Sequence, residues 1–295
     1  MLTEVRAVSV NASDWETLRG RPMYARIDGP FRPRHRVLGS DIAGRVVAVG
    51  PGVTAFQTGD EVFGDILGQK GGFAEYARAK TDALARIPAG LSFVEAAAIP
   101  QAGVIALQGI EQKGRVRAGQ RVLVTGAGGG AGSFAVQLAK RAGAEVTAVD
   151  RAAKFDLMRG LGADQVVDFT VTDITRTGER YDLILDLSAH RSVLHYRRAL
   201  TSGGRYLYVG GTVPTLLQAL LLGPLIGRSA HLGLLVVQPN PTDLLEVAQR
   251  CVDGTLRPVI DREYPLDEVP AALTYLGEGH AKGKVVITLQ DPSHR

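Results

Sequence analysis

The eight residues at 125–132, TGAGGGAG, constrain the fold of this chain more than any other stretch. They lie between an apolar run at 121–124, RVLV, and a segment at 133–144 in which apolar residues recur at helical spacing. The first run is short and rich in β-branched residues, which is typical of a parallel strand buried on both faces. A glycine turn from strand to helix lets a ligand approach the backbone, and the helix N-terminus offers free N–H groups to an anion. The pattern predicts a dinucleotide site, with a tight turn that binds no ligand as the alternative.

The next strand favours the dinucleotide. EVTAV at 145–149 ends in Asp150, roughly 20 residues after the turn, where a carboxylate can hold ribose hydroxyls. That position repels a 2′-phosphate and therefore slightly favours NAD(H). The residues predicted to bind the pyrophosphate are Gly126, Ala127, Gly128, Gly129, Gly130, Ala131 and Gly132.

Further apolar runs follow at 165–168, 182–186 and 205–209, separated by helix-like segments at 153–161 and 192–200. Alternation of this kind predicts an α/β fold, in which a parallel sheet carries helices on both faces. Ligands of such sheets lie beyond the carboxyl ends of the strands. The residues that follow two of these strand ends, and that we expect near the cofactor, are Leu187, Ser188, Gly210 and Gly211.

Composition excludes several other classes of protein. The net charge is +4, but 30 acidic residues nearly match 34 basic ones, and no basic stripe is interleaved with aromatic residues. We therefore expect no nucleic-acid partner, and we interpret RPRHR at 32–36 as a solvated loop. The single cysteine, Cys251, forms no internal disulfide and fits the cytoplasm, and the first ten residues show no signal-peptide pattern. The most apolar segment, at 216–226, is too short to span a bilayer, so we expect no membrane partner.

The first 95 residues differ in texture from the rest. Short β-rich runs at 43–49 and 61–63 lie between glycine and proline turns, which is typical of a small irregular β-domain. Near the end, 264–279 is predicted to form a turn and a helix. The run KVVITL at 284–289 is predicted to be a strand that returns to the first domain.

Taken together, the chain resembles the zinc-independent quinone oxidoreductase branch of the medium-chain dehydrogenase/reductase superfamily. The matching stretches occur in family order and are SVNASDW (9–15), VLGSDIAGRVVAVGPGV (37–53), GDEVFG (59–64), GGFAEYA (71–77), AAAIP (96–100), the glycine turn with its helix, LGADQVVDF (161–169) and GHAKGKVVITL (279–289). The resemblance implies a GroES-like β-domain at 1–95, completed by 263–295, and an inserted Rossmann domain at 96–262. The cofactor is then expected in the cleft between them.

The resemblance also implies an activity. Hydride would pass from NAD(P)H to a quinone or an α,β-unsaturated carbonyl without zinc, and the carry-over of the family's SVNxxDW-like segment makes Asn11 and Asp14 the predicted catalytic residues. The alternative is that both cap a helix beginning at Trp15. Relatives often hold the phosphate of NADPH with basic residues where Arg151 and Lys154 stand here, which opposes the slight preference for NAD(H).

Two other dehydrogenase families share parts of this pattern. Tyr76 and Lys80 match the YxxxK pair of short-chain dehydrogenases, but in that family the pair follows the glycine turn, so we interpret the match as coincidence. The usual zinc-ligand motif of the alcohol dehydrogenases, Gly-His-Glu, aligns with residues 39–41, Gly-Ser-Asp, and a four-cysteine site is impossible. We therefore predict no metal site, because a catalytic zinc needs three protein ligands.

Some features leave alternatives open. Relatives usually carry about 25 more residues ahead of this chain's start, so we expect an unpaired edge in the β-domain. A non-catalytic dinucleotide-binding sensor is therefore the first alternative, and an NAD(P)-dependent alcohol dehydrogenase the second. We expect a bulky apolar acceptor, against walls formed by Trp15, Phe73 and 216–226. We also expect a homodimer that pairs through 231–237.

Overall fold

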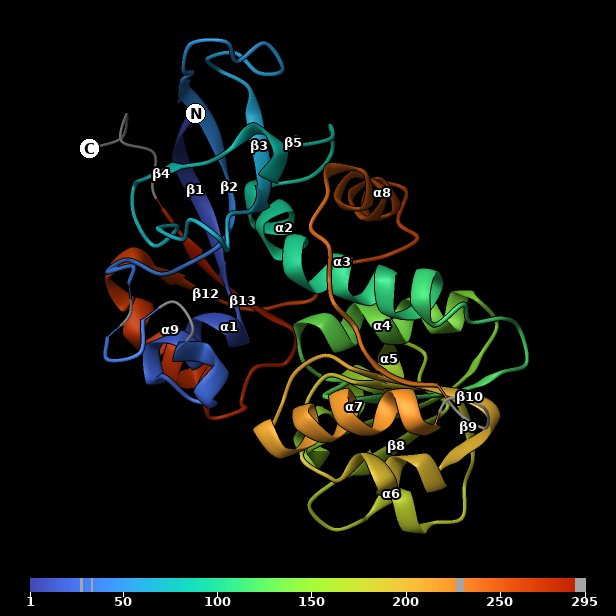
Figure 1. Cartoon of the computed structure of the whole chain (residues 1–295). Helices are drawn as coiled ribbons and strands as arrows, with labels where there is room; N and C mark the ends of the chain where they lie inside the picture. Colours follow the sequence, from blue (N-terminus) through green and yellow to red (C-terminus); the bar gives the residue numbers. More distant parts are fainter. Residues whose placement is uncertain (27–28, 33, 227–230, 290–295) are drawn as a thin grey trace. The chain divides into compact units, whose positions relative to one another are not determined.

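The computed structural model describes residues 1–26, 29–32, 34–226 and 231–289. The chain divides into two compact units, of which unit 1 comprises 1–104 and 238–295 and unit 2 comprises 105–237 (Figure 1). Unit 2 is shorter than the Rossmann domain expected at 96–262, because residues 96–104 and 238–262 belong to unit 1. The reason at the second division is α8 (Pro241–Val252), which packs against β5 (Leu84–Arg86) of unit 1. Within the described residues no helix is long and apolar enough to cross a membrane.

Unit 2 is a parallel sheet with helices on its faces. Read from one edge, the strand order is β8-β7-β6-β9-β10-β11, the doubly wound order in which the chain reverses direction between β6 and β9. The strands are β6 (Arg121–Thr125), β7 (Glu145–Asp150), β8 (Gln165–Asp168), β9 (Tyr181–Asp186), β10 (Leu200–Tyr208) and β11 (His231–Leu234). The helices of this part of the chain are η3 (Gln108–Lys113), α4 (Gly130–Arg141), η4 (Ala152–Lys154), α5 (Phe155–Gly160), η5 (Ile174–Arg176), α6 (Val193–Arg198) and α7 (Val213–Ile226). This confirms the predicted α/β fold.

The apolar composition of β6 explains its central place. Val122, Leu123 and Val124 are fully buried, and β6 pairs in parallel with both β7 and β9. A strand with helices over both faces has no solvent side, so apolar residues follow one another without alternation. Figure 1 shows α4 on one side of this sheet and α6 and α7 on the other.

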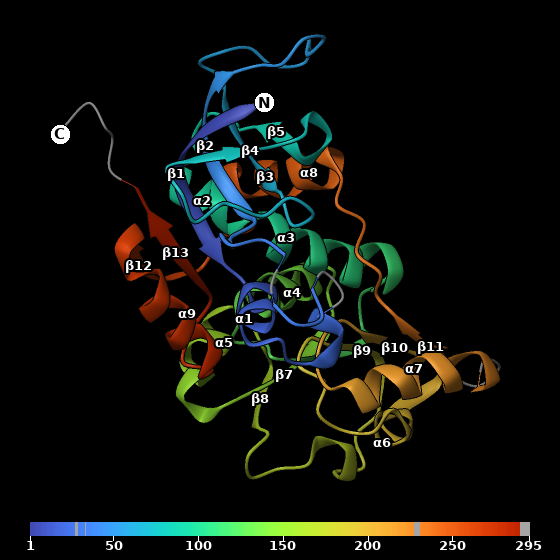
Figure 2. The same ribbon diagram turned by 60° about the vertical axis from the view of Figure 1, so that its left-hand side comes forward.

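Unit 1 is built on a mostly antiparallel sheet of order β12-β13-β1-β2-β3-β5, with β4 paired to β1. Its other strands are β1 (Leu2–Val10), β2 (Asp41–Ala48), β3 (Glu61–Asp65), β4 (Tyr76–Arg78), β12 (Ile260–Pro265) and β13 (Lys284–Thr288). Its other helices are α1 (Ala12–Arg19), η1 (Met23–Arg26), η2 (Thr81–Ala83), α2 (Phe93–Ala98), η6 (Leu266–Glu268) and α9 (Val269–Gly277), and α3 (Pro100–Leu107) crosses the division between the units. Figure 2 shows β12 and α9 beside β13.

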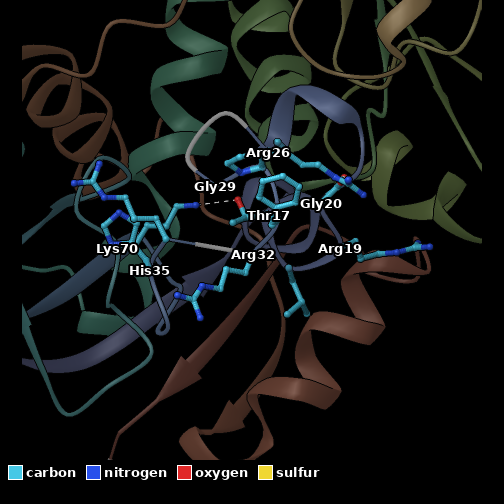
Figure 3. Close-up of a pocket in the computed structure, with 13 residues that line it drawn as sticks. Thr17, Arg19, Gly20, Arg26, Gly29, Arg32, His35 and Lys70 are labelled. Carbon is cyan, nitrogen blue, oxygen red and sulfur yellow. Dashed lines mark hydrogen bonds between the residues drawn. The ribbon is translucent and has the colours of Figure 1, made fainter.

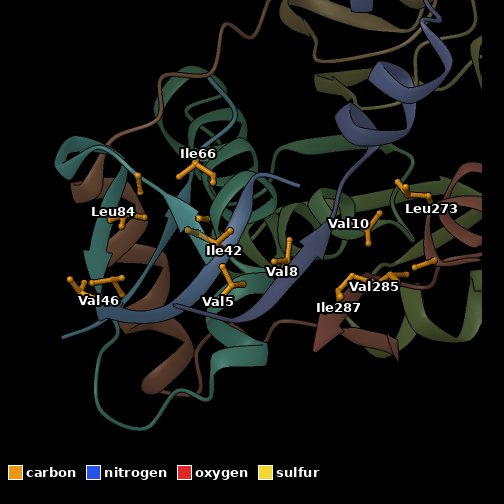
Figure 4. Packing of buried hydrophobic residues seen from close by; sticks show 14 of the residues in the cluster. Val5, Val8, Val10, Ile42, Val46, Ile66, Leu84, Leu273, Val285 and Ile287 are labelled. Atoms are coloured by element: carbon orange, nitrogen blue, oxygen red, sulfur yellow. The ribbon is translucent and has the colours of Figure 1, made fainter. Parts of the chain in front are cut away.

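The last described strand returns to the first, as the sequence predicts. Val8 of β1 pairs with Ile287 of β13, and Val10 pairs with Val285. These side chains belong to one core with Ile42 of β2, and all of them are nearly or fully buried (Figure 4). Burial of an aliphatic side chain contributes about 1.5–3 kcal/mol, so this core ties the two ends of the chain together.

The turn and helix predicted at 264–279 are confirmed: β12 ends at Pro265, and η6 and then α9 follow. Two other sequence expectations about unit 1 are wrong in detail. The first helix begins at Ala12 rather than at Trp15. The expected unpaired edge does not lie at β1, because β2 flanks this strand on one side and β4 and β13 flank it on the other. This last difference arises from pairing between segments far apart in the sequence, which local patterns do not encode.

Candidate functional site

The glycine turn lies where β6 passes into α4. Gly126 has a φ of 65°, in the left-handed region that glycine adopts without strain. A Cβ on Gly132 would stand 2.2 Å from the carbonyl oxygen of Gly126, so this glycine lets the first turn of α4 pack onto the turn. The spacing of the glycines therefore sets the local geometry before any ligand is considered.

The N-terminus of α4 is open to an anion. Gly129 is its N-cap, in extended conformation and with no side-chain cap hydrogen bond. A Cβ on Gly129 would meet only one atom within 4 Å, the carbonyl oxygen of Gly126 at 3.3 Å. Free N–H groups and the positive end of the helix dipole favour a phosphate at such a place. The predicted residues from Gly126 to Gly132 therefore fit a dinucleotide pyrophosphate.

Asp150, at the end of β7, lies against this turn. Its Oδ2 accepts a hydrogen bond of 3.0 Å from the backbone N–H of Gly128. Lys154 Nζ lies 3.4 Å from the other carboxylate oxygen, and both side chains are more than nine-tenths buried. Arg151 is exposed. The structure thus brings the predicted ribose carboxylate and one of the two predicted cations together as an ion pair.

The residues that follow the carboxyl ends of β9 and β10 lie at the same edge of the sheet as the glycine turn. The backbone N–H of Ala189 donates to the carbonyl of Gly210 at 2.8 Å, and Gly211 has a φ of 141° and bridges Ala189. Ser188 reaches the glycine turn, because a Cβ on Gly126 would stand 3.3 Å from its Cβ. The predicted residues Leu187, Ser188, Gly210 and Gly211 therefore lie beside one another, and Ser188 lies next to the turn.

A buried carboxyl beneath the turn was missed in the sequence. Asp186 accepts hydrogen bonds from Thr125 Oγ1 at 2.5 Å and from Tyr206 Oη at 2.7 Å. Burial raises its pKa to about 6, against the lowering effect of these hydroxyl groups. It joins β6, β9 and β10 where the strand order reverses, so it positions the turn. An acidic residue ending the apolar run DLILD was the available signal.

A second cluster of polar side chains lies inside unit 1. Asn11, between β1 and α1, is 7% exposed, and its Oδ1 accepts a 2.6 Å hydrogen bond from Lys284 Nζ. Its Nδ2 makes no hydrogen bond to the described residues, although the amide lowers the pKa of Asp41 and so faces that carboxylate. Asp41 Oδ1 has no hydrogen-bond partner there either. This donor and this acceptor are therefore buried in the same place, and neither completes a hydrogen bond of normal geometry within the described residues.

Lys284 and Asp41 form the charged centre of this cluster. Lys284 Nζ lies 3.6 Å from Asp41 Oδ2, and both side chains are almost fully buried. Burial raises the pKa of Asp41 and lowers that of Lys284, and each charge partly offsets the shift of the other. Asp41 Oδ2 also accepts from Ser9 Oγ at 3.3 Å and from the backbone N–H of Gln101 at 3.1 Å. Sequence reasoning missed Lys284, although a lysine opening the apolar run KVVITL is unusual enough to be a signal.

Asp14 supports the backbone around Asn11. Its two carboxylate oxygens accept the backbone N–H groups of Asn11 and Gly39, each at 3.0 Å, and the side chain is fully buried. Burial raises the pKa of Asp14 to about 6, while these two N–H groups lower it. The structure thus brings the two predicted catalytic residues together, and the contacts of Asp14 are to backbone.

Gln101 connects this cluster to a third carboxyl. Its Nε2 donates to Ser40 Oγ at 2.7 Å, and lies 3.4 Å from Asp65 Oδ1. Burial and the nearby charge of Asp41 raise the pKa of Asp65 to about 7. The charges of Asp41, Asp14 and Asp65 all act on the single ammonium of Lys284 and raise its pKa against the lowering effect of burial.

These residues do not fit a zinc ion. Over the described part of the chain, no group of three or more His, Cys, Asp and Glu side chains is arranged to hold a metal. Ser40 and Asp41 are bonded to Gln101, as described above, and Cys251 lies on α8 with its thiol pKa raised to about 12 by burial. A zinc ligand must be a thiolate, a neutral imidazole or a carboxylate, so this thiol is poorly suited.

The YxxxK match in unit 1 lacks the arrangement that its chemistry needs. Tyr76 begins strand β4 and is 48% exposed, and Lys80 follows the end of that strand. In a helix, side chains four positions apart lie about 5–6 Å from each other, whereas in an extended segment they lie about 13 Å apart. Here the segment is extended, which supports the interpretation as coincidence.

Comparison with known proteins gives consistent matches over both units. Residues 1–89 match the alcohol dehydrogenase GroES-like domain, and residues 161–287 match the zinc-binding dehydrogenase family. A chloroplastic quinone-oxidoreductase homolog of Spinacia oleracea is 31% identical over 97% of this chain and 89% of its own length. The 2-methylene-furan-3-one reductase of Solanum lycopersicum is 34% identical over 97% and 71%. The quinone oxidoreductase structure from Coxiella burnetii superimposes with a TM-score of 0.86, at 28% identity over 98% and 90%.

Proposed function

Because the chain belongs to the medium-chain dehydrogenase/reductase superfamily and is an NAD(P)-dependent oxidoreductase, we propose that it transfers hydride to a quinone or an α,β-unsaturated carbonyl. The observation that supports this most directly is the unused amide donor of Asn11 in a buried, charged cluster. Reduction of such acceptors builds negative charge on an oxygen, and a fixed hydrogen-bond donor stabilises that charge.

Lys284 determines which end of the Asn11 amide faces the acceptor. Its ammonium donates to Oδ1, so the oxygen is held; Nδ2 carries two N–H donors, of which one can face Asp41 and the other is left to donate to the acceptor. The orientation is enforced by burial, because the reversed amide would place two donors together with no acceptor between them. Asn11 is therefore proposed to bind the acceptor oxygen, and Lys284 to position Asn11.

Asp14 is proposed to act through the backbone of Asn11. Both of its oxygens are occupied by backbone N–H groups, so it holds the start of α1 against Gly39. When bound, the nicotinamide of NAD(P)H supplies the hydride. The protein's part is to hold the acceptor, exclude water and stabilise charge.

The cofactor is proposed to bind at the glycine turn, with a slight preference for NAD(H). Asp150 favours ribose hydroxyls, whereas its partner Lys154 reduces the repulsion of a 2′-phosphate. These two effects oppose each other within one ion pair, so the expected preference is small.

The acceptor is proposed to be apolar and its reduction to need no zinc. Trp15 and Phe73 are partly buried against the core of unit 1. A Cβ on Gly39 would stand 2.7 Å from the backbone nitrogen of Phe73, so this aromatic residue lies against the residue that precedes Ser40 and Asp41. A partly apolar wall beside a few polar groups suits a flat quinone or an enone.

A panel of acceptors tests this function. Purified protein with NADH or NADPH should reduce quinones or enones, and activity should survive treatment with a chelator. Oxidation of simple alcohols with loss of activity on chelation would instead indicate a zinc alcohol dehydrogenase. Tight cofactor binding without turnover of any acceptor would indicate a dinucleotide sensor.

We also propose that the protein forms a homodimer through the β11 edge of unit 2. Among the described strands, β11 pairs with β10 alone, and its other side is an unpaired edge. Leu217, Leu220 and Leu221 on α7, which contacts β11, are 50%, 49% and 68% exposed. An apolar patch beside an unpaired strand favours a second copy of the chain. Light scattering should give twice the monomer mass at micromolar concentration, and a stable monomer would contradict the proposal.

A further inference from the structure

A basic cavity lies in unit 1, beside the C-terminal half of α1 (Figure 3). Its volume is about 240 Å³, and no described residue that lines it is acidic. The basic residues that line it are Arg19, Arg26, Arg32, Arg34, His35 and Lys70. On sequence alone, 32–36 is interpreted as a solvated loop. In the structure, residues of this loop line the cavity together with residues of α1, of η1 and of the segment after β3.

Lys70 is the strongest sign of an anionic ligand. It is 6% exposed, and its Nζ donates to Thr17 Oγ1 at 2.9 Å (Figure 3). No carboxylate of the described residues forms an ion pair with it. A buried ammonium that lacks a counter-charge is costly, and an anion in the cavity would offset that cost. Its backbone φ of 53° is uncommon for a non-glycine residue, and strain of this kind is often retained at functional sites.

The arginines of the cavity are only partly engaged. Arg26 Nε donates to the carbonyl of Gly20 at 2.8 Å, and the Arg19 guanidinium lies 5.2 Å from the centre of the Trp15 ring. Arg32 and Arg34 are exposed and make no ion pair with the described residues. Guanidinium groups bind phosphate oxygens in pairs, so Arg32 and Arg34 could add to the charge of Lys70.

The cavity also offers apolar contacts. Leu18 and Phe31 line it and are 51% and 98% exposed. A volume of 240 Å³ corresponds to roughly eight water molecules, more than a single inorganic anion needs. The lining therefore suits a phosphate group that is attached to an organic body.

Helix α1 connects this cavity to the proposed acceptor site. Asn11 precedes its first residue, and Arg19 and Gly20 stand at its other end. Eight helical residues span about 12 Å. We propose that the cavity binds the phosphate group of a phosphorylated acceptor, whose reducible carbonyl lies about 12 Å away at Asn11. This inference rests on the proposed function.

A matched pair of acceptors tests the inference with NADH as donor. One is a naphthoquinone with an alkyl chain ending in a phosphate monoester, and the other ends in an uncharged alcohol. The wild type should show a KM at least about tenfold lower for the phosphate ester. The double variant Arg32→Gln/Arg34→Gln should remove most of that advantage and leave kcat and the KM of the alcohol unchanged. Arg36→Gln is the control, because Arg36 is exposed on the same loop but does not line the cavity.

Inorganic pyrophosphate separates the two possible sources of the anion. Competition with the phosphate ester but not with the alcohol supports an acceptor tail. Pyrophosphate binding to NADH-saturated protein that is lost in Arg32→Gln/Arg34→Gln, but that leaves the KM of both acceptors unchanged, would assign the cavity to a free anion and overturn the inference. Equal KM values for the two acceptors in the wild type, or equal effects of the double variant on both, would also overturn it.

Failure of the proposed function would look different. If neither acceptor were reduced, the proposal that this oxidoreductase acts on quinones would fail, but calorimetry with pyrophosphate, with the glycine turn saturated by NADH, would still report on the cavity. Binding lost in Arg32→Gln/Arg34→Gln and kept in Arg36→Gln would support an anion site. Absence of binding to the wild type would overturn it.

Discussion

The glycine turn of unit 2 takes its shape from eight consecutive residues, whereas the polar cluster of unit 1 combines side chains from segments as distant as Asn11 and Lys284. In the turn, backbone N–H groups and missing side chains make the room for a ligand. In the cluster, buried charges orient one amide. The turn should therefore be sensitive to added volume, and the cluster to altered charge.

The largest effect is expected from added volume at the turn. Gly129→Val should abolish cofactor binding, because its side chain would occupy the place of the pyrophosphate while meeting little protein. Fluorescence titration with NADH and NADPH measures this. Gly160→Val is the control, since a Cβ there meets nothing within 4 Å, and it should bind normally. Normal binding by Gly129→Val would remove the cofactor from this turn.

A change of charge in the cluster should instead alter the free energy of unfolding of the protein. Burial raises the pKa of Asp65 to about 7 from an ordinary 3.8, so the folded state binds the proton more tightly than the unfolded state. The stability that this provides is complete below pH 4 and is lost as pH rises towards 7. Asp65→Asn should therefore raise the free energy of unfolding at pH 8 by about 2–4 kcal/mol and add little at pH 4. Urea unfolding at both pH values measures this, and an equal effect at both would contradict the shift.

Removal of the cluster's cation should reduce turnover without weakening cofactor binding. Lys284→Met frees the Asn11 amide to rotate, and misplacement of such a group can lower kcat about 10–100-fold. The single variant leaves Asp41 buried without a cation and can unfold, so Lys284→Met/Asp41→Asn is the matched variant. Steady-state kinetics should show a lowered kcat in the folded double variant. A kcat equal to that of the wild type would show that Lys284 does not position Asn11.

The smallest effect is expected at the ion pair beside the turn. Asp150→Asn removes the charge that repels a 2′-phosphate, and should shift the ratio of NADPH to NADH affinity by about tenfold towards NADPH. Lys154→Met should shift it in the opposite direction. Titration of both cofactors into both variants measures the ratio, and an unchanged ratio in Asp150→Asn would contradict the role of this carboxylate.

The difference between a turn formed by consecutive residues and a cluster formed by distant ones also determines what could be predicted from the sequence. The strand, glycine turn and helix at 121–141 follow from local pattern, and so does Asp150 after the next strand. The pairing of Lys284 with Asn11 depends on β13 lying beside β1, a contact across almost the whole chain. Local spacing does not encode such a contact, and neither does it encode the basic cavity, to which α1 and the segment after β3 contribute.

The family resemblance predicted more of the unit 1 cluster than residue spacing did, but it did not predict all of its residues. It identified Asn11 and Asp14, which the structure brings together through a backbone hydrogen bond. It did not identify Lys284, whose ammonium holds the Asn11 amide oxygen, or Asp41 and Gln101, which are hydrogen-bonded to each other in the same cluster. Those contacts join four separate segments of the chain and had to be read from the structure.

The central claim, that the Asn11 amide stabilises charge on the acceptor oxygen, is tested most directly by single-turnover oxidation of bound NADH or NADPH. Asn11→Ala removes the donor and should slow hydride transfer to a quinone or enone about 100-fold or more, with unchanged cofactor affinity. A rate equal to that of the wild type in a variant that binds the cofactor normally would contradict the account.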